Sequence, residues 1–327
     1  MRFLRGALIA TLLLGCGEDA TSPSGVPGSA PGTPSGGPAL ALASNTWAAR
    51  PPVPRPHSDF AVGTAPNAAG QPVVYVFGGQ DETGTGFPSY SYNVATNTWA
   101  PGGAYSRAAY MNGVGKIGNR LYFTGGESCC EADFETFRTT WAYEPSTERL
   151  FQKADMPRPT KYGVTGVING KLYVLAEVSS ATGFVSQLYR YDPTTNSWTL
   201  RRRSPHFHTF GAGGVIDNKF YVVGGSDRTR YLDVYDLATN TWMTRAPIPT
   251  AGDRLFAAVF QHRLFVLSWY QPTGGAGILK AYSYDPATNS WRSRTAPPVA
   301  GPIVQVILNG QGRLFLAGRE SSYLYTP

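Results

Sequence analysis

The sequence predicts an all-β protein built from six similar four-stranded sheets, and three observations lead to this fold class. Gly, Pro and Tyr are abundant at 38, 26 and 19 residues, and charged residues make up only 15% of the 327, which suits short strands joined by turns. A phrase ending in Trp recurs about every fifty residues. One copy of that phrase lies near the N-terminus without the strands that precede it elsewhere. Together these features predict a ring of sheets, a six-bladed β-propeller.

The repeat is clearest in a four-residue phrase of Thr or Ser, Asn, Thr or Ser, and Trp. A degenerate copy, Thr147-Glu148-Arg149-Leu150, carries Leu where the other copies carry Trp. Successive phrase ends lie 52, 51, 48, 44 and 49 residues apart. A self-similar period of this length is typical of propeller blades. The five full copies are 44–47, 96–99, 195–198, 239–242 and 288–291.

Each repeat has the same internal order. An apolar strand rich in Gly and Ala, such as 162–168, leads through a tight turn such as 169–170 into a second strand. The second strand ends in a Gly pair, as at 78–79, 125–126 and 224–225, which we expect to adopt φ values that other residues disfavour. A Tyr-bearing third strand and the Trp phrase of the fourth complete the repeat. We expect the Tyr and Trp rings to fill the wedges between blades.

With Gly pairs, Tyr and Trp at fixed offsets, residues 41 to 327 resemble the Kelch repeat. The resemblance implies a propeller with four-stranded blades. Three copies depart from the Gly pair, with Ala176-Glu177, Ser268-Trp269 and Ala317-Gly318 in its place. These departures identify blades three, five and six as divergent.

The ends of the chain are expected to share one blade. Five complete blades run from about His57 to Trp291. After them the chain supplies three strands, at 302–308, 313–317 and 323–325. The missing fourth strand is expected from 40–53, which would close the ring and remove exposed sheet edges. Residues 40–327 are therefore predicted to form one propeller domain, expected to be monomeric.

Residues 1–15 are predicted to be a signal peptide. Arg2 and Arg5 precede an apolar run at 6–14 that is too short to span a bilayer. The phrase that ends in Cys16 resembles the lipobox of bacterial lipoproteins, which implies an acylated Cys16 and a membrane anchor; a chance Cys after an ordinary signal peptide is the alternative. By resemblance to enterobacterial sorting, Gly17 favours the outer membrane, on its periplasmic or surface face. Residues 16–39, rich in Pro, Gly and Ser, are predicted to be a tether.

Five basic residues are predicted to form a ligand face. Aligning the repeats places Arg107, Arg158 and His206 at equivalent positions between blades, with Arg55 and Arg254 nearby. Such a basic rim at the channel mouth would suit an anionic ligand. The alternative is that these side chains only hydrogen-bond neighbouring backbone.

The other chemistry-bearing residues do not complete a catalytic or metal site. His206 and His208 are half a zinc or copper site without an evident third ligand, so no metal and no cofactor are predicted. Cys129 and Cys130 form either a vicinal disulfide or a link to another chain. They lie in an acidic loop that is expected to be solvated. The copper and ligand set of the galactose oxidase group cannot be assembled here.

The leading functional hypothesis is a lipid-anchored, extracytoplasmic binding scaffold without catalysis that presents a propeller face to a protein or glycan. Sialic acid epimerases with Kelch repeats suggest an alternative, an enzyme acting on a sugar acid, with Glu177 and Arg158 as its acid/base groups. A structural ring in an envelope complex is a third hypothesis. The formal charge of +7 includes no long Lys/Arg run, so nucleic acid is not an expected partner.

Overall fold

The protein was analysed as a computed structural model that describes residues 45–55, 60–79, 89–102, 112–128, 135–180, 183–225, 228–273, 275–298, 303–308, 313–318 and 321–326. All of these belong to one compact unit, Leu42–Pro327. The other unit, Met1–Ala41, contains Cys16 and lies outside the described residues. In the described part of the chain, no helix has the length and apolar character needed to cross a membrane.

The described residues form six four-stranded antiparallel sheets. Blades one to three are β2 (Ala61–Pro66), β3 (Pro72–Phe77), β4 (Tyr90–Asn93) and β5 (Thr98–Pro101); β6 (Gly115–Ile117), β7 (Arg120–Thr124), β8 (Thr140–Glu144) and β9 (Arg149–Lys153); and β10 (Val164–Ile168), β11 (Lys171–Ser180), β12 (Gly183–Asp192) and β13 (Ser197–Leu200). Blades four to six are β14 (Ala212–Ile216), β15 (Lys219–Val223), β16 (Leu232–Asp236) and β17 (Thr241–Arg245); β18 (Arg254–Phe260), β19 (Arg263–Tyr270), β20 (Ile278–Asp285) and β21 (Ser290–Arg294); and β22 (Ile303–Leu308), β23 (Leu314–Gly318), β24 (Ser322–Thr326) and β1 (Thr46–Arg50).

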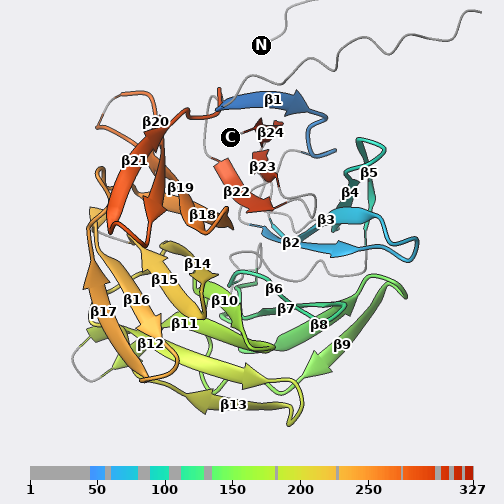
Figure 1. The fold of residues 1–327 in the computed structure, drawn as a ribbon. Helices are drawn as coiled ribbons and strands as arrows, with labels where there is room; N and C mark the ends of the chain where they lie inside the picture. The colour runs from blue at the N-terminus through green and yellow to red at the C-terminus, as the bar shows by residue number, and fades with distance from the viewer. Residues whose placement is uncertain are drawn as a thin grey trace, which may run out of the picture. The chain divides into compact units, whose positions relative to one another are not determined.

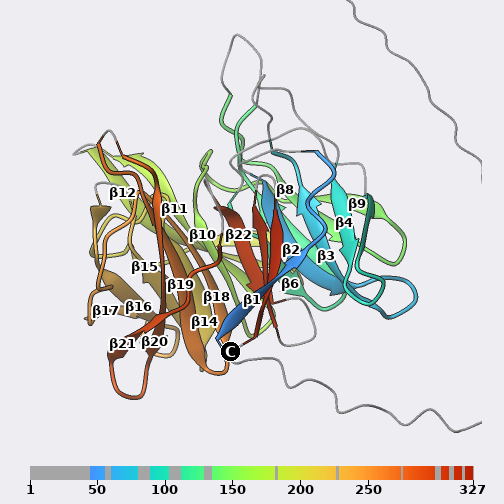
Figure 2. The ribbon, with the colours of Figure 1, turned by 90° about the horizontal axis from the view of Figure 1, so that it is seen from above.

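The sheets are arranged as blades around a common centre (Figure 1). The first strand of each blade is innermost, and each of these inner strands contacts the inner strands of both neighbouring blades. Seen from above, the blades stand side by side with their strands running between two faces (Figure 2). The prediction of a six-bladed propeller is confirmed.

The N-terminal strand closes the ring as the sequence predicts. β1 pairs antiparallel with β24 along its whole length, from Thr46 opposite Thr326 to Arg50 opposite Ser322. The Trp47 ring packs on Tyr325 with centroids 4.8 Å apart, much as Trp291 packs on Tyr284 at 5.1 Å in the preceding blade. Closure is therefore achieved by residues at opposite ends of the domain.

The Gly pairs decide where the second strands end. Gly125 and Gly126 have φ values of 69° and 98°, and a Cβ on Gly125 would lie 2.2 Å from the Thr160 carbonyl oxygen. Blade three has Ala176-Glu177 at this position, and there β11 and β12 continue as ten-residue strands. The divergent motif thus lengthens the blade without changing its topology.

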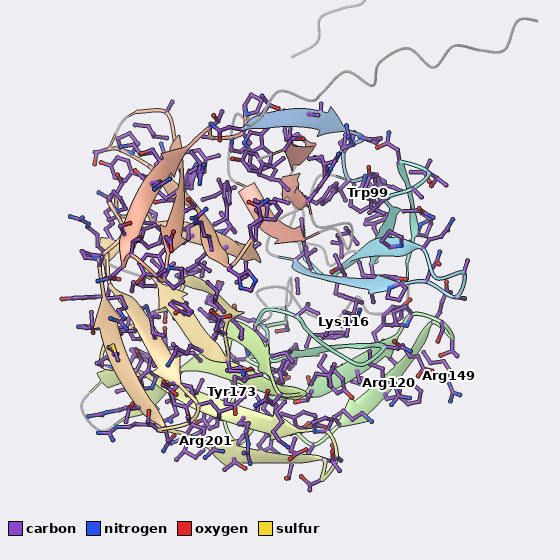
Figure 3. All side chains as sticks on the ribbon, in the orientation of Figure 1. Trp99, Lys116, Arg120, Arg149, Tyr173 and Arg201 are labelled. Carbon is purple, nitrogen blue, oxygen red and sulfur yellow. The ribbon has the colours of Figure 1, made fainter. Side chains whose placement is uncertain are left out.

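Adjacent blades are joined by a repeated clamp of Tyr, Asn and Trp. In blade three the Tyr191 hydroxyl donates to the Asn196 carboxamide oxygen at 2.7 Å, and the Trp198 indole N–H donates to the Ala154 carbonyl at 2.8 Å. The same Tyr–Asn bond forms in five blades, each with its Asn at positive φ. The five Trp residues of these clamps, including Trp99 in Figure 3, all donate to the segment that arrives from the preceding blade.

Candidate functional site

The segments that connect one blade to the next lie at the same edge of the sheets as the loops between second and third strands, because the strands alternate in direction. We call this edge the connecting face. The connection 201–211 passes from the outer strand β13 of blade three to the inner strand β14 of blade four. It carries His206 and His208, the only histidine pair in the sequence.

Both histidines bind the same buried carboxylate. The Nδ1 of His206 lies 2.9 Å from one oxygen of Asp233, and the Nε2 of His208 lies 3.0 Å from that same oxygen. The Nδ1 of His208 lies 2.6 Å from the Gly224 carbonyl oxygen, so both of its ring nitrogens lie within hydrogen-bond distance of an acceptor. The side chains of His208 and Asp233 are fully buried. They form a buried, hydrogen-bonded pair.

Hydrogen bonds hold Asp233 in its ionised form. Burial alone would raise the pKa of Asp233, but hydrogen bonds from His208, Thr244 and His206 and the charge of His208 lower it to about 2. The Thr244 hydroxyl donates at 2.7 Å and the Ser204 hydroxyl at 3.1 Å. The carboxylate therefore serves as the anchor of the 201–211 connection. His206 is additionally stacked on Tyr231, with centroids 3.5 Å apart.

The five basic residues of the predicted ligand face lie in different settings. His206 lies over β16, the third strand out from the centre, where it is held by Asp233. Arg158 is exposed. Burial raises the pKa of Tyr189 in β12, and the positive charge of Arg158 offsets part of that rise. Arg254 opens the inner strand β18, and Arg55 is exposed. Arg107, Cys129 and Cys130 lie outside the described residues.

An aromatic and cationic row lies where three neighbouring inner strands begin. Tyr162, Phe210 and Arg254 each stand six residues before the last residue of β10, β14 and β18 respectively, so they occupy equivalent positions in blades three, four and five. We call these three residues the strand-entry row. The rings of Tyr162 and Phe210 have centroids 4.0 Å apart, and the Arg254 guanidinium lies 5.7 Å from the Phe210 centroid. All three side chains are partly exposed.

The backbone at this row is unusual. Tyr162 and Phe210 have φ values of 56° and 60°, a region that bulky side chains rarely adopt. The Leu255 N–H also donates to the Phe210 carbonyl at 3.4 Å, which joins blades four and five at this point. Strained backbone of this kind collects at binding and catalytic sites, where the surrounding structure holds it in place.

Charged side chains flank the row. The Lys161 ammonium pairs with the buried Glu127 carboxylate of blade two and lies 5.5 Å from the Tyr162 ring centroid. The hydroxyl of Thr209, the residue before Phe210, donates to the Glu177 carboxylate. Glu177 lies in β11, two residues beyond Leu175, which pairs with Val164 at the start of β10. The row therefore combines two rings with cations and a carboxylate.

Sequence reasoning identified Arg254, Glu177 and His206 here but missed Tyr162, Phe210 and Asp233. The signal for the row was available, because counting back from the first hairpin turn aligns Tyr162, Phe210 and Arg254. Their different residue types conceal that alignment. No spacing signals Asp233, because its partners come from a connection whose path is not periodic. Among the described residues, no group of three or more His, Cys, Asp or Glu is placed to hold a metal ion.

Comparison with known families matches the Kelch motif to residues 209–249, which contain the four strands of blade four and extend past the end of β17. The chain is therefore a six-bladed β-propeller that contains a Kelch motif, a fold that serves both binding scaffolds and enzymes. The solved structure of YjhT is similar to this chain, with a TM-score of 0.64 at 16% sequence identity. The alignment covers 84% of this chain and 95% of that chain, and it shows the fold alone. No curated protein matches the sequence.

Proposed function

We propose that the protein is a binding scaffold for a glycan that carries an acidic group, and that the ligand docks at the strand-entry row. The observation that carries the proposal is the close packing of Tyr162, Phe210 and Arg254 at equivalent entries to adjacent inner strands. The positive φ of both aromatic residues means that the fold accepts a backbone cost to keep these rings in place.

The chemistry of the row suits such a ligand. The face of an aromatic ring carries partial negative charge, so the polarised C–H bonds of a sugar ring pack favourably on it. The Arg254 guanidinium offers paired N–H donors to a carboxylate, in a geometry that lysine lacks. The net charge of +7 favours the approach of an anionic ligand over a neutral one.

A pair of matched ligands tests this proposal. Oligogalacturonate and the corresponding galactose oligosaccharide share their ring stereochemistry and differ in the carboxylate. We expect tighter binding of the acidic ligand in titration calorimetry. Arg254→Gln should weaken binding of the acidic ligand about tenfold, or about 1.4 kcal/mol, and should leave the neutral ligand nearly unaffected.

A second variant tests the rings. Phe210→Asn removes the ring and keeps a residue that accepts positive φ, so it should weaken binding of both ligands. The control is Arg292→Gln, an exposed arginine on the outer strand β21, which should bind as the wild type does. Equal affinity for both ligands, or an unchanged affinity in Arg254→Gln, would refute the assignment.

The Glu177 carboxylate beside the row supports a second candidate function, an enzyme that acts on a sugar acid. Its hydrogen bond from Thr209, the residue before Phe210, holds it near the strand-entry row, where it could exchange a proton with a bound ligand. Proton NMR of a sugar acid in deuterated water distinguishes the two functions. Exchange or epimerisation that is lost in Glu177→Gln would support the enzyme, whereas binding without exchange supports the scaffold.

We further propose that the protein is anchored to the outer membrane through acyl chains on Cys16, outside the cytoplasm. The support is the sequence from Arg2 to Cys16, which resembles a lipoprotein signal peptide. Each buried CH₂ of an acyl chain contributes roughly 0.8 kcal/mol, so two or more acyl chains would give stable anchoring. Cys16→Ser should move the protein from the membrane pellet to the soluble fraction, and mass spectrometry of the wild type should show acyl mass. A membrane-bound Cys16→Ser variant together with an unmodified wild type would disprove the anchor.

A further inference from the structure

The connection from blade three to blade four crosses the strands of blade four in order. The Nδ1 of His206 lies 2.9 Å from the carboxylate of Asp233 in β16, and the Nδ1 of His208 lies 2.6 Å from the carbonyl oxygen of the residue that follows β15. Phe210 stands two residues before the inner strand β14. Because β14, β15 and β16 are neighbours in the sheet, the connection runs inward to the strand-entry row. We call residues 201–211 the radial segment.

Both blades hold the radial segment in place. On the side of blade three, the Ser186 hydroxyl accepts the His208 backbone N–H at 2.9 Å, and the Ser186 carbonyl accepts the Ser204 N–H at 3.0 Å. On the side of blade four, Asp233 accepts from the Ser204 hydroxyl at 3.1 Å. A surface that is ordered before binding loses little conformational entropy when a ligand docks. The radial segment therefore offers a preformed floor.

A second exposed ring lies beside the outer part of this floor. Tyr231 stands immediately before β16 and is 43% exposed. Its ring stacks on His206, with centroids 3.5 Å apart and the ring planes within 8°. Neighbouring strands lie about 4.8 Å apart, so β14 and β16 are separated by about 10 Å. This separation is comparable with the length of two linked pyranose rings, so a sugar chain that begins on Phe210 extends to Tyr231.

The long hairpin of β11 and β12 borders the radial segment. Phe184 of β12 is 65% exposed and lies on the same side of its strand as Leu188, which packs in the core between blades three and four. Arg228, in the loop between β15 and β16, is directed toward blade five. Its Nε lies 2.8 Å from the Asp253 carboxylate, and its guanidinium lies 4.6 Å from the Tyr270 ring centroid. Arg228 therefore does not cover the radial segment.

Cationic side chains lie at both ends of the radial segment. Arg202 and Arg203 are exposed at its outer end, and neither has an ion-pair partner among the described residues. Arg254 of the strand-entry row lies at the inner end. Two carboxylates contact the segment, but Asp233 is fully buried and Glu177 accepts a hydrogen bond from the segment itself. The exposed charge along this path is therefore mainly positive.

We propose that the radial segment extends the binding site, and that it takes an acidic oligosaccharide chain that runs from the strand-entry row past Tyr231 to Arg202 and Arg203. This inference rests on the proposed function, because the row holds the first sugars of the chain. The inner and outer strands of a four-stranded sheet lie about 15 Å apart, so a disaccharide on the row does not reach the arginines. A longer chain joins both sets of contacts in one ligand, which raises its affinity.

Chain length tests the extension with the full protein. Digalacturonate and hexagalacturonate are titrated separately by calorimetry at pH 7, where their carboxylates are ionised. We expect the hexamer to bind at least about tenfold tighter than the dimer. A long chain also gains somewhat because it offers a short site more registers, and the tenfold limit is set above that gain.

Two sets of variants locate the extension. Tyr231→Ala should weaken hexamer binding about fivefold and leave dimer binding unchanged, whereas Tyr231→Phe keeps the ring and should bind both ligands as the wild type does. The double variant Arg202→Gln with Arg203→Gln should also reduce the affinity for the hexamer alone, and should lower the salt dependence of that affinity. The control is Met243→Ala, which removes a 48% exposed apolar side chain from the outer strand β17 of the same blade.

The outcomes separate this extension from the proposed function. Binding of the dimer without a gain for the hexamer would overturn the extension and leave the proposed function standing. Hexamer binding that is unchanged in both Tyr231→Ala and the double arginine variant would overturn it as well. If neither galacturonate binds, the proposed function and its extension both fail.

Discussion

Asp233 shows how a single buried residue can fix a long connection. Its carboxylate accepts hydrogen bonds from Ser204, His206 and His208 of the connecting segment and from Thr244 of its own sheet. In blade three, Tyr189 stands at the position equivalent to Asp233, 44 residues earlier in the chain. Arg158 stands at the position equivalent to His206, 48 residues earlier. Arg158 is exposed, and no carboxylate stands at the blade-three position, so blades three and four differ in how their connections are held.

Asp233→Asn should destabilise the protein and change its response to acid. The substitution should cost about 2 kcal/mol, because hydrogen bonds to a buried carboxylate are lost or weakened. The pKa of Asp233 is about 2 in the folded protein against 3.8 as its ordinary value, so its ionisation contributes about 2 kcal/mol above pH 4. Because the folded pKa is the lower one, this contribution is lost as the pH falls from about 4 toward 2.

Urea denaturation at pH 7, 5, 4 and 3 measures both effects. The wild type should lose stability below pH 4 more steeply than Asp233→Asn does, and the exposed Asp217→Asn should behave as the wild type. Identical pH profiles for the wild type and Asp233→Asn would contradict the assigned role.

Individual site residues were harder to predict than the blades that hold them. Arg254 was identified from its charge, but its stacking partner Phe210 could not be distinguished from an ordinary core aromatic. The His206 and His208 pair was seen as half a metal site. Its actual partner is a carboxylate about 25 residues away, reached only because the connection folds over β16. Contacts of this kind depend on the path of irregular segments, which periodicity does not describe.

At the scale of elements, the repeated clamp couples five of the six blades to the blade before them. The Asn adopts positive φ, a conformation that Asn tolerates better than most residues, and its carboxamide then accepts the Tyr hydroxyl. The Trp ring packs on that Tyr, with centroids 5.3 Å apart for Trp242 and Tyr235. The indole N–H of Trp242 donates to the Arg202 carbonyl at 2.8 Å. One turn therefore supplies ring packing and a bridge between blades.

Two substitutions at Trp242 separate these contributions. Trp242→Ala should lower the free energy of unfolding by about 3 kcal/mol, because the ring leaves a cavity in the wedge. Trp242→Phe retains a ring on Tyr235 and loses the indole N–H, so it should cost about 1 kcal/mol. Thermal and urea unfolding measure both values. An unchanged melting curve for Trp242→Ala would mean that the wedge does not depend on this ring.

The element boundaries followed closely from the sequence. The final blade was predicted at 302–308, 313–317 and 323–325, and its strands span Ile303–Leu308, Leu314–Gly318 and Ser322–Thr326. The ten-residue strands β11 and β12 of blade three were less predictable, because without a Gly pair the local sequence contains no signal that ends them.

At the scale of the whole molecule, stability depends on closure of the ring. Each inner strand contacts both neighbours, so every blade is buried on two sides only while the ring is complete. The last link is made by β1, whose five residues all pair with β24. Asn45 adds hydrogen bonds to Tyr325 at 2.6 Å and to Thr295 of blade five at 2.6 Å. A short N-terminal segment thus joins blades five and six to the start of the chain.

Two truncations test this closure. Deleting residues 17–38 leaves β1 and Asn45 in place, so cooperative unfolding and the melting temperature should match those of the full chain. Extending the deletion through Val53 removes β1, exposes the edge of β24 and removes Trp47 from the wedge beside Phe265, where the ring centroids lie 6.2 Å apart. The longer truncation should lose cooperative unfolding or aggregate, as followed by circular dichroism during heating and by light scattering. A synthetic peptide covering 40–53, added in excess, should restore part of the cooperativity, because the missing strand pairs through main-chain bonds along one edge. Equal melting behaviour of the two truncations would show that the ring is held by its C-terminal strands alone.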